Sequence, residues 1–331
     1  MRKIDMNTDL EKEKTVEKVA EVQSVIKAIS AQVSQVIRGK DPVVETIMTA
    51  IFAGGHVLLE DVPGVGKTTL ARALARVLNL SFSRIQFTSD LLPSDIVGVQ
   101  VYRRSSEAFY FEPGPVFAQL VLADEINRTT PKTQSSLLEA MNERTVSVYR
   151  ETHELPNPFT VIATQNPTDF QGTYPLPESQ LDRFMFRLKL GYPDPETEIE
   201  ILGSDGYGDQ IATLRPVADE TFVQQTCQLV DKITVSDTLR RYIVKLVTAT
   251  RRHPELKIGI STRAAVAYQR AAKAYALVQG RQYVTPDDVQ QLAVPTLAHR
   301  IKCNQVAGSL SSTDESERII LDVVNMVEAP L

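Results

Sequence analysis

The chain lacks the features that mark secreted, membrane-spanning or disulfide-bonded proteins. Its 331 residues include two cysteines, Cys227 and Cys303, which lie far apart and form no C-x-x-C element. We expect reduced thiols there, because the two cysteines lack the spacing that a disulfide framework or a cysteine metal site requires. No run of 18 apolar residues occurs, and the first residues carry charges where a signal peptide is apolar. We therefore expect a cytoplasmic protein without membrane insertion.

An excess of positive charge is also missing. The net charge is −5, with 36 Lys and Arg against 41 Asp and Glu, which argues against a broadly basic surface for nucleic acid. Apolar residues make up 43% and charged residues 23% of the chain, as is usual for globular proteins. At this length we expect about two domains with an ample core.

The most informative motif spans residues 57–70, where a short apolar strand leads into a glycine-bearing loop and then an amphipathic helix. Glycines let successive backbone N–H groups turn toward one anion, and the N-terminus of the helix adds positive dipole. Lys67 is expected to reach the β- and γ-phosphates of ATP, and the Thr68 hydroxyl to hold Mg²⁺. The predicted nucleotide-binding residues are Pro63, Gly64, Val65, Gly66, Lys67, Thr68 and Thr69.

One position departs from the phosphate-loop pattern G-x-x-x-x-G-K-[ST]. Gly66, Lys67 and Thr68 satisfy the pattern, but Asp61 stands where the first glycine is expected. The departure weakens the motif taken alone, and a chance Gly-Lys-Thr in a surface loop is the competing interpretation.

Apolar, β-rich segments alternate with helical patterns in the first two thirds of the chain. Strands are predicted at 57–59, 84–87, 119–123, 160–164 and 184–188, with helices at 68–77, 131–142 and 178–183. This alternation is typical of a three-layer α/β fold with a mainly parallel sheet, in which ligands bind beyond the carboxyl ends of the strands. Residues 97–111 and 144–156 alternate as hairpins, and hairpins of this kind are either inert decoration or contact points for a partner.

Both ends of the chain are predicted to be helical. Apolar residues at spacings of three and four along residues 9–36 indicate a helix docked on the core. After residues 191–195 no buried strand is predicted, which indicates a smaller all-helical domain. The expected domains are an N-terminal helix at 1–35, an α/β domain at 36–192 and a helical domain at 193–331.

Two further strand ends carry residues suited to hydrolysis. Asp124 and Glu125 follow the strand at 119–123. There Asp124 can hold Mg²⁺ and Glu125 can act as a general base on the attacking water. Asn166 follows the strand at 160–164 and can position the same water; taken in isolation, it is more simply explained as capping the turn before Pro167.

These motifs together resemble the AAA+ ATPases, and specifically the MoxR family. The resemblance covers roughly residues 35–192 and includes the sequences FEPGPVF, DEINR, LLEAM, ATQNP, GTYPLPE and LDRF in this order; GISTR in the helical remainder matches more loosely. It implies a P-loop AAA+ domain followed by a helical lid, and it accommodates Asp61. It also identifies the two hairpins as the helix-2 and pre-sensor 1 inserts, which move with nucleotide state.

The family resemblance also implies roles for individual residues. ATP lies between neighbouring subunits of a ring, usually a hexamer. Asp124 and Glu125 are the Walker B residues and Asn166 is sensor 1. Arg183 resembles the arginine finger that reaches the neighbouring subunit's γ-phosphate. Arg263 resembles sensor 2 of the lid and acts either on its own nucleotide or on a neighbour's, since related families differ.

The leading functional interpretation is an ATPase that works as a chaperone-like remodeller or activator of partner proteins. The resemblance implies clients or adaptors such as proteins with von Willebrand factor A domains, or a role in metal or cofactor insertion. The alternative is a nucleic-acid motor of the same clade, although acidic residues offset the arginines at the hairpin tips. A small-molecule kinase is a third interpretation, but such enzymes seldom combine residues like Asn166, Arg183 and Arg263.

Overall fold

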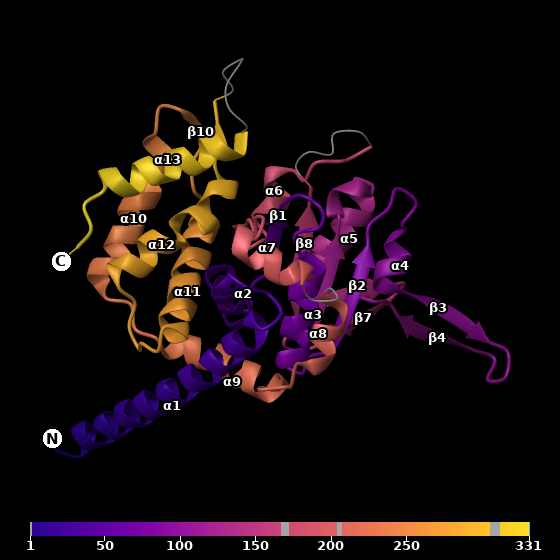
Figure 1. The fold of residues 1–331 in the computed structure, drawn as a ribbon, viewed down its shortest axis with the longest axis horizontal. Helices are drawn as coiled ribbons and strands as arrows, with labels where there is room; N and C mark the ends of the chain where they lie inside the picture. The colour runs from indigo at the N-terminus through magenta and orange to yellow at the C-terminus, as the bar shows by residue number, and fades with distance from the viewer. Residues whose placement is uncertain (1, 167–171, 204–206, 305–311, 331) are drawn as a thin grey trace.

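A parallel sheet of five strands forms the centre of the α/β part of the chain (Figure 1). The structure, a computed structural model, describes residues 2–166, 172–203, 207–304 and 312–330. Every strand pairing in this sheet is parallel, as expected when helices connect successive strands. The strands lie in the order β2 (Phe82–Gln86), β5 (Leu120–Asp124), β8 (Thr160–Gln165), β1 (Val57–Glu60) and β9 (Phe186–Leu188).

Helices cover both faces of this sheet. Successive strand residues point to opposite faces, so Val57 and Leu59 join one buried cluster while Leu58 joins the other. The predicted three-layer α/β fold with a mainly parallel sheet is therefore confirmed. The helices of this part are α2 (Asp41–Ala53), α3 (Lys67–Val77), α4 (Pro93–Val97), η1 (Ile126–Arg128), α5 (Pro131–Glu143) and α6 (Glu178–Leu181).

Sequence periodicity does not predict α2. Its residues from Ile47 to Ala53 are all buried, because β9, α9 and α11 pack around it. A helix surrounded by core lacks the polar face on which an amphipathic pattern depends. The helix was missed for that reason.

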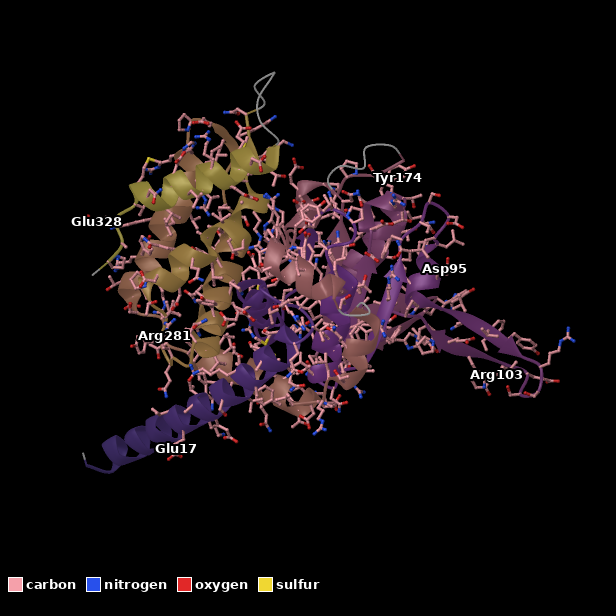
Figure 2. The ribbon with its side chains drawn as sticks, viewed as in Figure 1. Glu17, Asp95, Arg103, Tyr174, Arg281 and Glu328 are labelled. Carbon is pink, nitrogen blue, oxygen red and sulfur yellow. The ribbon has the colours of Figure 1, made fainter. Side chains whose placement is uncertain are left out.

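Two antiparallel hairpins extend from the α/β part, and both predicted hairpins are confirmed. Figure 1 shows the first reaching far from the sheet, and Figure 2 places Arg103 near its far end. The second packs against the base of the first, where the rings of Phe111 and His153 stack with their centroids 3.9 Å apart. The strands are β3 (Gly98–Arg103) with β4 (Ala108–Pro113), and β6 (Thr145–Val148) with β7 (Glu151–Glu154).

The C-terminal part is helical, as predicted, and carries one additional short ribbon. Strand β10 (Leu256–Ile258) pairs antiparallel with β11 (Lys302–Cys303). Strands of two and three residues at the surface leave too short a pattern for sequence analysis to detect. The helices are α7 (Pro195–Leu202), α8 (Tyr207–Thr213), α9 (Glu220–Lys232), α10 (Asp237–Arg252), α11 (Thr262–Val278), α12 (Pro286–Leu297), η2 (Ala298–Arg300) and α13 (Ser312–Met326).

The N-terminal helix α1 (Arg2–Ser34) begins before the predicted residue 9 and lies against both parts of the chain. It packs on α2 and α3 of the α/β part and on α11 of the helical part. Its predicted apolar stripe is buried at Val19, Ile26, Ile29 and Val33. Among the described residues, no helix combines the length and the apolar character that crossing a membrane requires.

Candidate functional site

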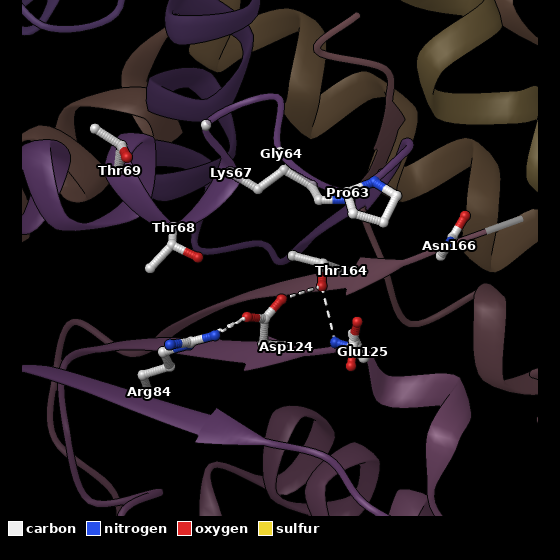
Figure 3. A pocket seen from close by; sticks show the side chains of 11 residues that line it. Pro63, Gly64, Lys67, Thr68, Thr69, Arg84, Asp124, Glu125, Thr164 and Asn166 are labelled. Atoms are coloured by element: carbon white, nitrogen blue, oxygen red, sulfur yellow. Dashed lines mark hydrogen bonds and ion pairs between the residues drawn. The ribbon is translucent and has the colours of Figure 1, made fainter. Parts of the chain in front are cut away.

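The predicted loop and strand ends meet in one pocket at the carboxyl edge of the sheet (Figure 3). The pocket has a volume of about 330 Å³ and lies where β1, β5 and β8 end beside the start of α3. This is the edge at which parallel α/β sheets bind ligands. The lining residues are Pro63, Gly64, Gly66, Lys67, Thr68, Thr69, Arg84, Asp124, Glu125, Thr164 and Asn166.

Backbone conformation explains the two glycines of the loop. Gly64 and Gly66 have φ angles of +88° and +93°, although no atom lies within 4 Å of a Cβ built on either. Glycine is favoured there because residues with side chains rarely adopt this conformation. Helix α3 begins at Lys67, directly after Gly66, so its first-turn N–H groups are available to an anion in the pocket. The side chain of Val65, the remaining predicted loop residue, packs into the core instead.

Asp61 fills the motif's first glycine position without disturbing the loop. Its backbone is outside the left-handed region, so a side chain costs nothing there. The carboxylate accepts hydrogen bonds from the backbone N–H groups of Val62 (3.0 Å) and Gly191 (2.5 Å). Asp61 therefore anchors the loop to the segment that follows β9.

Lys67 is held over the loop by two backbone carbonyls. Its Nζ donates to the oxygens of Asp61 (2.7 Å) and Val62 (3.2 Å). Burial lowers the pKa of Lys67, while the negative charges of Asp61, Asp124 and Glu125 act against this shift. The three carboxylates thus offset only part of the effect of burial, and the ammonium group can turn to the stronger acceptors that phosphate oxygens provide.

The carboxylate of Asp124 is held by partners from two neighbouring strands (Figure 3). The Thr164 hydroxyl on β8 donates to Oδ1 at 2.6 Å. The Arg84 guanidinium on β2 donates to Oδ2 through Nε (3.1 Å) and Nη2 (2.6 Å). Because β5 lies between these two strands, both partners approach along the carboxyl edge of the sheet.

Glu125 is fixed by its backbone as well as by its side chain. Its φ angle of +58° lies in the left-handed region, an uncommon conformation for a residue with a side chain, which is often found at functional sites. Its N–H donates to the Thr164 hydroxyl (2.8 Å), and its carboxylate accepts a hydrogen bond from Gln86 (2.8 Å) and lies 3.4 Å from Arg128. Thr164 therefore bonds to both adjacent acids.

The donor set fits a magnesium ion bound together with a nucleotide. Figure 3 shows Thr68 and Asp124 facing each other across the pocket. Magnesium in nucleotide sites takes one or two protein oxygens and completes its shell with phosphate and water. In the described ranges no group of three or more His, Cys, Asp or Glu residues forms a metal cage. The Thr68 hydroxyl and the Asp124 carboxylate are the residues that would hold the ion.

Asn166 lies at the carboxyl end of β8 and is 6% exposed. Its backbone carbonyl accepts a hydrogen bond from the Asn127 amide at 3.5 Å. Figure 3 shows Asn166 beyond Glu125 on the same side of the pocket. Asn166 thus lines the same pocket as Glu125, and its role in positioning the attacking water stays a prediction.

Arg183 and Arg263, predicted as catalytic, do not line this pocket. They line a second cavity of about 200 Å³, together with Arg144 and Arg300. Arg263 donates through Nη2 to the side-chain oxygen of Asn142 at 2.9 Å. The predicted site residues therefore form two groups within one chain: the loop and strand ends in the first cavity, and the arginines in the second.

Sequence analysis assigned no role to Thr164 or Arg84. Both carry a signal in the strand period of two. Thr164 lies on β8 two residues before Asn166, and Arg84 shares a strand face with Gln86 at the end of β2. Their importance depends on the order of strands in the sheet, which a single sequence does not specify.

Comparison with known families agrees with this geometry. The family described as "ATPase family associated with various cellular activities (AAA)" matches residues 56–186, and the AAA lid domain matches residues 248–320. The two matches cover the phosphate loop, both strand ends and the helices that surround the second cavity.

Several curated proteins are similar over most of their length. "Chaperone MoxR1" of Mycobacterium tuberculosis is 42% identical, covering 94% of this chain and 84% of that protein. "Uncharacterized protein YeaC" of Bacillus subtilis is 46% identical, covering 90% and 93%. "Protein MoxR" of Paracoccus denitrificans is 30% identical, covering 82% and 86%. A crystal structure of a candidate ATPase from Cytophaga hutchinsonii superposes with a TM-score of 0.86 at 37% identity, covering 97% of this chain and all of that one.

Proposed function

Because this chain belongs to the MoxR family of AAA+ ATPases, we propose that it hydrolyses ATP in a ring oligomer to remodel or activate partner proteins. The observation that carries the proposal is the pocket in which Lys67 and Thr68 face Asp124 and Glu125. Such a site has a phosphate-binding end and a water-activating end, as hydrolysis of a nucleotide requires.

The residues of the pocket divide the chemistry among them. Lys67 and the N-terminus of α3 bind the β- and γ-phosphates. Glu125 accepts a proton from the attacking water, and Asn166 holds that water in line. Mg²⁺ held by Thr68 and Asp124 would neutralise charge on the phosphates.

Arg183 is proposed to act on the nucleotide of a neighbouring subunit. Within one chain it lines a different cavity from Lys67, so a contact with phosphate has to come from another copy. Arg263 lines the same second cavity, which favours action in trans for it as well. A ring, with six subunits as the usual number in AAA+ proteins, would place this arginine cavity against the neighbour's phosphates.

A protein is the partner class that the first hairpin favours. Tyr102, Phe109 and Tyr110 are exposed on β3 and β4, and exposed apolar patches commonly mark protein contacts. Proteins with von Willebrand factor A domains, and metal or cofactor insertion, are the client types that the family suggests.

A nucleic-acid motor is the second candidate, and one observation favours it. Arg103 lies over the ring of Tyr110 at 4.8 Å, and aromatic rings beside arginines can stack with single-stranded bases. ATPase stimulation by single-stranded DNA that falls steeply with salt would support this candidate.

A subunit-mixing experiment tests the proposed function. We expect Arg183→Ala to bind ATP normally and to lose hydrolysis by about 10³-fold or more, as for other arginine fingers. Glu125→Gln should also bind ATP without hydrolysing it. Rings that contain both variants should recover activity, because an Arg183→Ala subunit keeps its own Glu125 and borrows its neighbour's arginine.

The controls for this experiment are the unmixed variants and a measurement of subunit exchange between labelled rings. Recovery should follow the degree of exchange. Rings that mix without recovering activity would contradict the trans role of Arg183, and hydrolysis by Lys67→Ala at the wild-type rate would contradict the assignment of the pocket.

A further inference from the structure

A buried arginine of the helical part forms hydrogen bonds with the segment that carries Arg183. Arg300 ends η2, and its side chain is 3% exposed. Its Nη2 donates to the backbone oxygens of Asp182 (3.2 Å) and Phe184 (2.9 Å), the residues on either side of Arg183. Its Nε lies 3.1 Å from the carboxylate of Asp182. One guanidinium therefore spans the whole turn.

Residues next to Arg300 form further contacts between the helical part and this region. Burial holds the pKa of His299 well below its usual value, so the ring is neutral and its Nε2–H donates to the same Phe184 oxygen at 3.0 Å. Lys302 forms an ion pair with Glu178 at the start of α6. Arg300 and His299 thus contact the short segment between α6 and β9, and Lys302 contacts the helix just before it.

Packing alone does not explain an arginine at this position. Desolvation, together with the charge of Arg263, lowers the pKa of Arg300 to about 10 despite the favourable charge of Asp182. A buried guanidinium is costly unless its hydrogen bonds are made. Nη2 donates to both carbonyls while Nε faces the Asp182 carboxylate, and Nε and Nη1 form no hydrogen bond among the described residues. A lysine has one nitrogen and cannot contact the carbonyls and the carboxylate from two positions.

The side chain of Arg183 depends on this backbone support. It donates through Nη1 to the Leu138 oxygen at 2.5 Å, while its buried Nε has no hydrogen-bond partner among the described residues. A group that stabilises a transition state must be placed to within a fraction of an ångström by its surroundings. Arg300 binds the carbonyls on both sides of Arg183, whereas the N–H groups of this turn bond only within the turn.

We propose that Arg300 is a positioning residue for Arg183, through which the lid of one subunit sets the hydrolysis rate at its neighbour's nucleotide. The inference rests on the trans role of Arg183 proposed above. Arg300 lines the second cavity and not the phosphate pocket. Loss of Arg300 should therefore impair hydrolysis at the neighbour's nucleotide, to which the subunit contributes Arg183. The phosphate pocket of the same subunit should be unaffected.

The test is the turnover and mixing behaviour of Arg300→Ala in the full chain. We expect kcat to fall by about 10- to 100-fold, the cost of a misplaced catalytic group, with unchanged affinity for a fluorescent ATP analogue. Mixing with Glu125→Gln should restore activity, because those subunits supply an intact Arg183. Mixing with Arg183→Ala should restore no activity, because neither variant supplies a correctly placed Arg183 to its neighbour.

Two further variants keep this test decisive. Arg300→Lys should fold and turn over at an intermediate rate, since its ammonium can donate to the carbonyls but has no second nitrogen to face the Asp182 carboxylate. It replaces the alanine variant if that one does not fold. Arg252→Ala, which removes an exposed arginine of the same part, should behave as wild type.

The outcomes separate this inference from the proposed function. If Arg183→Ala is rescued by Glu125→Gln but Arg300→Ala is not, the positioning role is wrong and the trans mechanism stands. If neither is rescued in rings that mix, both are wrong. Wild-type kcat in Arg300→Ala or Arg300→Lys would also overturn the positioning role.

Discussion

At the scale of single residues, the two acids of the pocket depend on one hydroxyl. Thr164 donates to the Asp124 carboxylate and accepts from the Glu125 N–H. It therefore holds the proposed metal ligand and the proposed general base in a fixed relation. Its residue type matters because a hydroxyl can donate and accept at once.

Replacing Thr164 by valine is the sharpest test of this link. The variant keeps the shape of the side chain but leaves Asp124 and Glu125 each without one partner. We expect the free energy of unfolding to fall by about 1–3 kcal/mol, the cost of unsatisfied buried polar groups. We also expect kcat to fall with little change in ATP affinity, measured by steady-state turnover and nucleotide titration.

Thr164→Ser is the matched control, because it retains the hydroxyl and should retain most of the turnover. A valine variant with wild-type kcat would show that the acids are positioned by other contacts.

At the scale of elements, the first hairpin stands apart from the compact core. Tyr102 and Phe109 face each other with ring centroids 5.2 Å apart, and Phe109 is 66% exposed. A two-stranded hairpin gains little stability from its own contacts. Its aromatic residues are therefore better explained by binding to a partner than by folding.

Replacing Phe109 by serine should separate these roles. We expect basal ATPase activity to be unchanged and stability to shift by less than about 0.5 kcal/mol, as for other surface substitutions. Binding of an unfolded model polypeptide, measured by fluorescence anisotropy, should weaken. Tyr149→Ser on the second hairpin, where the ring is 81% exposed, should leave that binding intact. An equal loss of polypeptide binding in both variants would indicate non-specific hydrophobic binding rather than a specific surface.

At the scale of the whole molecule, two buried histidines link distant parts of the fold. His56 accepts from the Val161 N–H (3.0 Å) and donates to the Met141 oxygen (3.1 Å), joining the sheet to α5. His299 joins the helical part to the α/β part through Phe184. The His56 ring must be neutral to accept at Nδ1, and burial favours the neutral form of both rings.

These histidines predict a stability that falls in mild acid. Burial lowers the pKa of His56 from 6.5 to about 4 and holds that of His299 well below 6.5. Between the unfolded and folded values the unfolded chain binds more protons, so the stability contributed by the neutral ring is lost as pH falls from about 6.5 toward 4. For His56 the loss amounts to about 3 kcal/mol.

Urea unfolding at several pH values between 7.5 and 4 would measure this dependence. His56→Gln should flatten the slope, because glutamine does not titrate. His253→Gln, at the end of α10 and not fully buried, is the matched control and should keep the slope of the wild type. A slope that is identical in all three proteins would contradict the assignment of His56.

The local order of residues was enough to predict the parallel sheet, both hairpins and the loop that lines the pocket, apart from Val65, which packs into the core. Each of those features depends on neighbours in the chain: a strand, then a turn that glycines permit, then a helix whose first turn offers N–H groups. Asp124 and Glu125 were predictable for the same reason, since they follow directly on an apolar strand.

The partners of those residues were decided by tertiary structure. Thr164 contacts Asp124 because β8 lies beside β5. Arg300 donates a hydrogen bond to Phe184, which lies 116 positions away in the chain. The formation of helix α2 likewise depends on the elements that pack around it. The same holds for the placement of Arg183 and Arg263 in the second cavity. Periodicity reports which face of an element is buried, but not which distant element covers it. Most residues that line the first cavity could be predicted from the sequence, whereas the second cavity and its buried arginine required the fold.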